Sequence, residues 1–278
     1  MTGSTEHPLG LEHLGGCLAL SRAANWNQNE ADWRLMLTIG RGWGISVAGG
    51  MLAASTLVLP FEHFAWISMV LVLPEHRRKG YATRLLRVAI ADLEKRGLAP
   101  VLDATPAGRK VYRLEGFRDT WGFKRYALQE KGSGPFSVAL RGAQEKGPDP
   151  FSRVLDLDRR AFGANREAVL RDLARRLPQA ALFQENGYLL GREGRQALQL
   201  GPLVARDEAT AIELLGCGLS AVKPPLYVDV VDHAPRLRQW LQARGFVFQR
   251  PFTRMVRGLA DAPGDEKLVY CVAGPELG

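Results

Sequence analysis

One stretch constrains the fold of this chain more than any other: an apolar run, a basic loop and a helix that begins at a glycine follow one another. Residues 70–73 (Val-Leu-Val-Leu) have the pattern of a buried strand, and a proline follows them. Residues 77–79 (Arg-Arg-Lys) then lead to Gly80, after which apolar side chains recur at helical spacing as far as Leu93. Gly97 is a suitable C-terminal stop. The sequence therefore predicts a strand, a basic loop and an amphipathic helix in succession.

A basic loop at the N-terminus of a helix is suited to bind an anion. The first N–H groups of the helix are free, the macrodipole favours negative charge, and glycine lets a phosphate approach the backbone closely. The pattern is neither the Gly-Lys-Ser/Thr of a P-loop nor the G-x-G-x-x-G of dinucleotide folds. A solvated basic turn before a surface helix has the same appearance, so the choice depends on a second segment.

That second segment spans residues 103–117, where a strand and a short helix lead to Tyr112 and then to a Gly-Phe pair. Together with Val-x-Pro-x-x-Arg-x-x-Gly-x-Ala at 72–82, it resembles the GNAT superfamily of acyl-CoA N-acyltransferases. The resemblance covers residues 1–128 and implies acetyl-CoA as cosubstrate, with no metal.

The resemblance also implies how the coenzyme would be held. Backbone N–H groups of residues 78–83 would bind the pyrophosphate, and the edge of residues 70–72 would pair with the pantetheine arm as an added strand. A backbone N–H on that edge would polarise the thioester carbonyl. The implied coenzyme-binding residues are Val70, Leu71, Val72, Arg77, Arg78, Lys79, Gly80, Tyr81, Ala82 and Thr83.

Tyr112 matches the family tyrosine that protonates the departing thiolate. A phenol with a pKa of about 10 is protonated at neutral pH and can serve as a general acid. The alternative is that Tyr112 only packs its short helix against the sheet. The family often has asparagine where this chain has Thr105 and alanine where it has Gly108, so the contacts of that asparagine are not implied here.

A chain of 278 residues exceeds the usual size of one domain, and its elements recur in a repeated order. Residues 1–128 read as a catalytic domain that ends in a strand pair near 117–128. Residues 129–150 read as a linker, with a short docking strand as an option at 136–140. The predicted fold class is α/β (α+β), with two tandem GNAT-like domains, each a mixed, mostly antiparallel sheet flanked by helices.

The second domain, residues 151–278, resembles that of YitH-type tandem acetyltransferases. The matching pieces are Arg-Ala-Phe-Gly-Ala at 160–164, Leu-Gly-Pro-Leu-Val-Ala at 200–205 and Arg-Pro-Phe-Thr-Arg-Met at 250–255. The repeat is degenerate where chemistry would occur. An Asp-Glu pair at 207–208 replaces the basic glycine loop and would repel a pyrophosphate. Leucine replaces the tyrosine four residues before Gly-Phe. This domain is expected to cover the sheet edge, shape the acceptor cleft or mediate a homodimer rather than bind acetyl-CoA.

Composition sets the remaining limits. The net charge of +8 comes from dispersed basic residues, with no basic tail and no zinc-finger or RNA-binding signature. Three distant cysteines, Cys17, Cys217 and Cys271, form neither a metal pattern nor a disulfide framework. There is no apolar run of about 18 residues and no signal-peptide pattern at the N-terminus, so no membrane partner and a cytoplasmic location are expected.

The acceptor side is less constrained by pattern. In GNAT folds the loop between the first two helices borders the acceptor pocket, which suggests Trp26, Asn27 and Trp33 as candidates. Glu62 and Trp66 are further candidates, just before and on the strand that leads to residues 70–72. Glu62 and His63 precede a strand and are candidates for a general base by position alone. The tryptophans could equally be ordinary core residues, and Glu62 and His63 could lie at a solvated strand end. Nothing here separates an amino acid, a polyamine, an aminoglycoside or a protein N-terminus as acceptor.

The sequence as a whole predicts an N-acetyltransferase that moves acetyl from acetyl-CoA to a primary amine by direct transfer in the first domain. Two other classes stay open. A non-catalytic acyl-CoA-binding sensor would hold the coenzyme without amine-dependent turnover. A nucleic-acid-associated protein would use the basic surface and show steep salt-dependent DNA binding.

Overall fold

The computed structural model describes residues 4–130 and 150–278, and the predicted linker falls almost wholly outside these ranges, as does the optional strand at 136–140. The elements of the first half are β1 Thr5–Leu9, α1 Leu14–Ala23, α2 Glu30–Ile39, β2 Arg41–Ser46, β3 Leu52–Pro60, β4 Phe64–Val72, α3 Tyr81–Lys95, β5 Ala99–Ala104, α4 Pro106–Leu114 and β6 Arg118–Leu128. Those of the second half are α5 Pro150–Phe162, α6 Glu167–Arg176, β7 Leu182–Gln184, β8 Gly187–Arg192, β9 Leu198–Ala205, α7 Glu208–Ala221, β10 Leu226–Val231, α8 Pro235–Gln242, β11 Val247–Val256 and β12 Val269–Cys271.

The strands of both halves form one continuous sheet. Within the described ranges its order is β1-β2-β3-β4-β5-β11-β6-β10-β12-β9-β8-β7. The β4–β5 and β9–β10 pairs are parallel and the other pairs are antiparallel. This confirms the predicted mixed, mostly antiparallel sheet with flanking helices.

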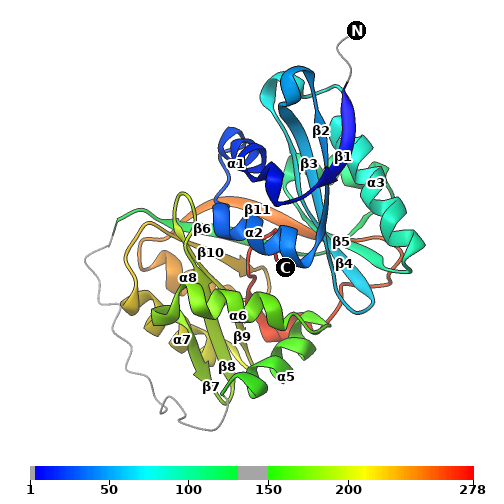
Figure 1. Cartoon of the computed structure of the whole chain (residues 1–278). Helices are drawn as coiled ribbons and strands as arrows, with labels where there is room; N and C mark the ends of the chain where they lie inside the picture. Colours follow the sequence, from blue (N-terminus) through cyan, green and yellow to red (C-terminus); the bar gives the residue numbers. More distant parts are fainter. Residues whose placement is uncertain (1–3, 131–149) are drawn as a thin grey trace.

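The two halves exchange their last long strands. β11 of the second half lies between β5 and β6 of the first, and β6 in turn lies between β11 and β10. Figure 1 shows these two strands side by side at the centre of the molecule, with the C-terminus between the halves. Each half therefore depends on a strand from the other.

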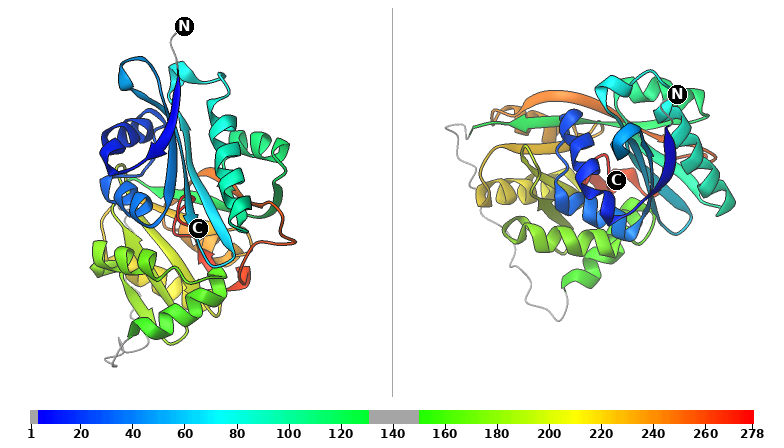
Figure 2. Two further views of the ribbon diagram at one scale, coloured as in Figure 1. Left: turned by 45° about the vertical axis from the view of Figure 1, so that its right-hand side comes forward. Right: turned by 45° about the horizontal axis from the view of Figure 1, so that its top comes forward.

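Helices cover both faces of the first half's sheet. The pleat of β4 sends Ala65 and Ile67 toward the apolar face of α3, whereas Phe64 and Trp66 belong to the large core on the other side. Figure 2 shows α1 and α2 on one side of the blue strands and α3 on the other. The alternation of side chains along β4 thus supports two separate cores.

Three details differ from the sequence-based expectation. The strand pair expected near 117–128 is the single strand β6, because its hairpin-like partner comes from β11 in the second half. β1, which includes a proline at the sheet edge, and the three-residue β12 were not predicted. The first helix of the second half, α5, begins at Pro150, the last residue of the segment read as a linker.

A local irregularity in β4 positions the site. Met69 has a left-handed backbone with φ of 52°, and the register of β4 with β3 shifts beside it. On its other side, β4 pairs with β5 only from Phe64–Ala99 to Trp66–Val101. Beyond that point the two strands separate. The backbone of residues 70–72 is therefore left with an edge that β5 does not cover.

Candidate active site

A groove begins where β4 and β5 separate. Its walls include Val70, Leu71, Val72, Arg77, Arg78 and Ala82 on one side, and Thr105, Ala107, Gly108, Val111 and Tyr112 of the α4 segment on the other. The groove therefore runs from the exposed edge of β4 to the N-terminus of α3, which are the two features that the sequence predicts for a coenzyme site.

The N-terminus of α3 is open to an external anion. Its N-cap, Gly80, is left-handed with φ of 78°, and no side chain caps the helix. A Cβ placed on Gly80 would have no heavy atom within 4 Å, so the space beside the loop is free. Unclaimed N–H groups, open space and the nearby guanidinium groups of Arg77 and Arg78 fit a pyrophosphate.

The other predicted loop residues have different surroundings. Gly80 and Thr83 border a shallow hollow beside Glu6 rather than the groove itself. Lys79 is exposed, with Nζ 3.3 Å from Nδ1 of His76. Tyr81 packs its half-buried ring against the small core at the start of α3. Any contact of these residues with a coenzyme in the groove would come from their backbone or from flexible side chains.

Tyr112 lies where the groove meets a second cavity. Thr105 begins its helix, with Oγ1 accepting a hydrogen bond from N–H of Gly108 at 3.2 Å. A Cβ on Gly108 would lie 2.9 Å from Cε2 of Tyr112, so the glycine leaves room for the ring. Burial raises the pKa of Tyr112 to about 12, and the phenol is therefore protonated at neutral pH. The contact with the ring explains why glycine rather than alanine stands at 108.

The helix that carries Tyr112 is fastened to β6 through one carboxylate. Asp119 accepts a hydrogen bond from Nε of Arg109 at 3.0 Å and pairs with a second Arg109 nitrogen and with Arg113. Hydrogen bonding to Arg109, with Arg113 assisting, lowers the pKa of Asp119 to about 2. The carboxylate is therefore ionised at neutral pH and holds two successive turns of α4.

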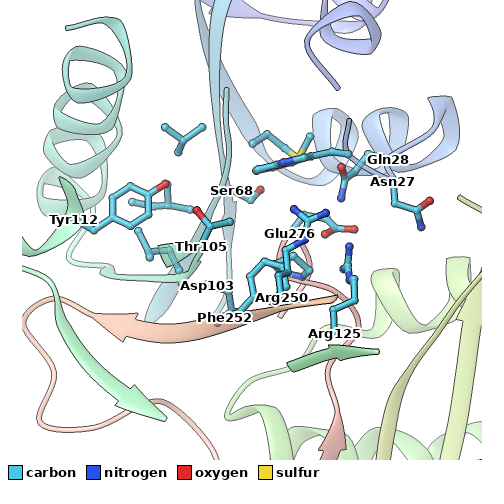
Figure 3. Close-up of a pocket in the computed structure, with 16 residues that line it drawn as sticks. Asn27, Gln28, Ser68, Asp103, Thr105, Tyr112, Arg125, Arg250, Phe252 and Glu276 are labelled. Carbon is cyan, nitrogen blue, oxygen red and sulfur yellow. The ribbon is translucent and has the colours of Figure 1, made fainter. Parts of the chain in front are cut away.

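The second cavity lies deeper, between the two halves. It shares Trp26, Val70, Asp103, Thr105 and Tyr112 with the groove. Its further polar wall comes from both halves: Asn27, Gln28, Ser68, Arg125, Arg250 and Glu276. Figure 3 shows Tyr112 at one end of this set and Gln28, Arg250, Glu276 and Arg125 toward the other. A molecule in this cavity would meet one in the groove beside Tyr112.

Two of the predicted acceptor residues, Trp26 and Asn27, do line this cavity. The side chain of Asn27 is already occupied, however. Its Oδ1 accepts from the backbone N–H groups of Gln196 and Ala197 at 2.8 and 3.0 Å, and its Nδ2 donates to the carbonyl of Ala197 at 3.0 Å. Asn27 therefore joins the two halves rather than presenting free hydrogen-bonding groups.

The other predicted acceptor residues lie outside this cavity. Trp33 is in the core, with Nε1 donating to Oγ of Ser21 at 2.9 Å. Trp66 is buried and donates to the carbonyl of Pro275 at 3.1 Å. These two rings are apolar core material with satisfied N–H groups.

Glu62 and His63 are exposed at the far end of β4, and neither lines the cavity. Glu62 instead forms an ion pair with Arg159 of the second half at 2.8 Å. The ring of His63 contacts that of Phe64, with 5.1 Å between centroids. Position before a strand was an insufficient signal for a general base.

Sequence reasoning missed the cavity residues that come from distant segments. Arg125 belongs to β6, Arg250 and Phe252 to β11, and Glu276 to the C-terminal tail. Arg250 and Phe252 lie within a piece that resembles YitH-type proteins, but nothing in the sequence placed that piece beside β5. The signal would have been the strand exchange itself, which a single sequence does not reveal.

The comparisons with known proteins agree with this architecture. Residues 22–117 match the family described as "Acetyltransferase (GNAT) family", and residues 154–271 match that described as "Acetyltransferase (GNAT) domain". The chain belongs to the GNAT acetyltransferases, with one GNAT domain in each half. It is thus an acyltransferase of the tandem GNAT kind that the sequence predicted.

Three relatives span nearly the same length. An uncharacterised N-acetyltransferase, YitH of Bacillus subtilis, is 24% identical over 84% of this chain and 85% of its own. A putative acetyltransferase from Pyrococcus horikoshii has a TM-score of 0.79 at 18% identity, covering 99% of this chain and 96% of that one. A tandem GNAT protein of the clavulanic acid pathway has a TM-score of 0.64 at 14% identity, covering 93% and 100%. The structural likenesses show the fold.

The second GNAT domain of this chain differs at the places where the first has its groove. α7 is capped by Asp207, whose Oδ1 accepts from N–H of Thr210 at 2.8 Å. Oε1 of Glu208 accepts from N–H of Leu237 at 2.8 Å. Leu241, at the position of the tyrosine, is fully buried. An anion at the N-terminus of α7 would therefore meet the capping carboxylate of Asp207 and a second carboxylate beside it, on Glu208.

No helix within residues 4–130 and 150–278 is long and apolar enough to cross a membrane. No group of three or more His, Cys, Asp or Glu side chains in those ranges is arranged to hold a metal ion.

Proposed function

We propose that the first domain, residues 1–128, transfers acetyl directly from acetyl-CoA to a primary amine held in the second cavity. The observation that carries this is the meeting of two cavities at Tyr112: a groove that ends at an uncapped helix N-terminus, and a deeper polar cavity between the halves. One cavity fits the donor and the other the acceptor.

The residues that would hold the donor follow from the groove. Free N–H groups at the start of α3, with Arg77 and Arg78, would bind the pyrophosphate. The uncovered edge of residues 70–72 would receive the pantetheine arm through backbone hydrogen bonds. When bound, acetyl-CoA supplies the activated acetyl group as a thioester.

Tyr112 would handle both proton transfers of the reaction. The amine nitrogen forms the new amide bond while the carbon–sulfur bond breaks, and the sulfur gains a proton. Tyr112 would donate this proton from its hydroxyl and recover one from the attacking nitrogen. Its pKa of about 12 favours the second step, because the phenolate would be a stronger base than the amine. A backbone N–H on the edge of β4 would stabilise the developing oxyanion.

The second domain would have no coenzyme of its own, because its helix N-terminus is capped by Asp207. It would contribute instead the far wall of the acceptor cavity, through β11 and the C-terminal tail.

The test is release of free thiol from acetyl-CoA across a panel of primary amines. Amine-dependent release that a Gly80→Asp variant abolishes would support the proposal. Coenzyme binding accompanied by slow hydrolysis, without stimulation by any amine, would instead favour the acyl-CoA-binding sensor.

A further inference from the structure

The charges around the acceptor cavity are paired with one exception. Asp103 is held by Arg254, with Nε and Nη2 each 3.0 Å from a carboxylate oxygen. Arg125 is held by Asp229, with nitrogen–oxygen distances of 2.7 and 2.6 Å. Both pairs are buried, and each is bidentate. Neither pair leaves a net charge for a ligand to neutralise.

Glu276 is likewise neutralised on one side. One carboxylate oxygen pairs with Arg192, a fully buried guanidinium that also contacts Asp32 at 2.6 Å. Its other oxygen, Oε2, is buried and has no hydrogen-bond partner among the described residues. The cavity wall thus includes a carboxylate oxygen that can accept a further hydrogen bond.

Arg250 is the exception. It lines the cavity and is half-buried, yet no ion pair or hydrogen bond joins its guanidinium to any residue in the described part of the chain. It stands directly across from Arg125 in the β6–β11 register, so two guanidinium groups flank the cavity on adjacent strands. Burial, together with the nearby charge of Arg125, lowers the pKa of Arg250. An anion beside Arg250 would relieve both effects.

A second unpartnered acceptor lies on the same wall. Gln28 is 2% exposed, and its Oε1 has no hydrogen-bond partner among the described residues. Figure 3 shows Gln28, Glu276 and Arg250 together at the end of the cavity away from Tyr112. A buried acceptor without a partner is costly, so Gln28 and Glu276 both favour a ligand that brings N–H or O–H donors.

We infer that the acceptor is a small amine that also bears a carboxylate, as an amino acid does, with the carboxylate bound by Arg250 and donor groups facing Gln28 and Glu276. One unpaired guanidinium matches one carboxylate. A polyamine or aminoglycoside would bring several positive charges to a cavity whose only unpaired charge, within the described residues, is already positive. This inference rests on the proposed function for its site and sharpens it to one substrate class.

The experiment compares amines that differ only in the anionic group. Thiol release is measured with lysine against cadaverine, ornithine against putrescine, and a set of amino acids against their amides, with phosphoethanolamine as a phosphate arm. The carboxylated member of a pair should be preferred by about 10- to 100-fold in kcat/KM, the range for a hydrogen-bonded charge. Equal or better turnover of the polyamines would overturn the inference while leaving the proposed function standing. Preference for phosphoethanolamine would overturn the carboxylate assignment.

Variants of Arg250 supply the matched control. Arg250→Met should erase the preference by raising KM for the carboxylated amine, with little change for its amide, and Arg250→Lys should restore part of it. Acetyl-CoA affinity should be unchanged in both, which reports that the fold is intact. If no amine releases thiol, the proposed function fails. Calorimetric titration of the same pairs then decides the anion site, and binding that is absent or insensitive to Arg250→Met overturns it.

Discussion

Arg254 of β11 holds the buried carboxylate of Asp103 of β5 through two hydrogen bonds of 3.0 Å, which joins the second half of the chain to the active-site wall of the first. The guanidinium also lies between two indole rings, 4.4 Å from the ring centroid of Trp66 and 4.0 Å from that of Trp121. Burial raises the pKa of Asp103 even though Arg254 opposes the rise. The exchanged strand β11 therefore supplies the positive charge that stabilises this buried carboxylate.

Removing Arg254 alone should destabilise the protein strongly. Arg254→Met keeps most of the side-chain volume but leaves Asp103 buried without its partner, which typically costs about 3–5 kcal/mol of unfolding free energy. Urea denaturation measures this loss. The double variant Asp103→Asn with Arg254→Met should recover part of it, because the uncompensated charge is gone. A single-variant loss below about 1 kcal/mol, the range of an exposed pair, would show that the pair is not effectively buried.

The local signals of the first half were readable in the sequence because their physics is local. The apolar spacing after Gly80 and the stop at Gly97 are set by neighbours within a few turns, and both glycines have the left-handed backbone that the pattern requires.

The cavity proposed to hold the acceptor could not be predicted from the sequence, because its walls meet only through long-range strand pairing. Arg250 reaches the site because β11 leaves its own half, and Glu276 because the C-terminal tail lies between the halves. Trp33 and Trp66 are buried outside this cavity, and the sequence could not show that, because periodicity identifies a buried ring but does not distinguish a core from a cavity wall. A glutamate before a strand, such as Glu62, carries still less information, since its partner is Arg159 of the other half.

Coenzyme binding should depend on Gly80 through charge and space. Gly80→Asp would put a carboxylate where the pyrophosphate is proposed to lie, so acetyl-CoA affinity measured by calorimetry should be lost. Gly97→Asp is the matched control. Gly97 lies at the other end of α3, has φ of 65° and is equally free of neighbours, so it carries a similar backbone cost. Equal loss of affinity in both variants would indicate backbone strain rather than a phosphate site at Gly80.

The same titration should give one coenzyme per chain. Asp207 caps the corresponding helix N-terminus in the second half. Two equivalent sites per chain would contradict the assignment of donor binding to the first domain alone.

Asp119 should make the stability of the fold depend on pH in the acid range. Its folded pKa of about 2 is below the unfolded value of about 3.9, so its contribution is complete above the unfolded pKa and is lost as pH falls through the folded one. Urea midpoints at pH 6, 4, 3 and 2 should show the wild type approaching Asp119→Asn as pH falls. A constant difference between the two proteins down to pH 2 would mean that the carboxylate does not hold α4 as described.

Removing one oxygen atom distinguishes a catalytic role of Tyr112 from a packing role. Tyr112→Phe keeps the ring beside Gly108 and Phe117 but removes the hydroxyl at the junction of the two cavities. If the hydroxyl donates the proton to sulfur, kcat should fall while acetyl-CoA affinity is nearly unchanged, because the lost interaction belongs to the transition state. General acid–base catalysis contributes ~10²–10⁴-fold, and the lower end is expected here because water in the groove can replace part of the donor.

The pH profile sharpens that test. With a pKa of about 12, Tyr112 stays protonated throughout the usable range, so wild-type kcat should show no decline attributable to its ionisation below about pH 11. Steady-state kinetics of the wild type and Tyr112→Phe with one responsive amine would measure both properties. A reduction in kcat of less than about threefold is far below the contribution of a general acid. In that case Tyr112 would be a packing residue of α4, and the proton would have to reach the sulfur through solvent in the groove.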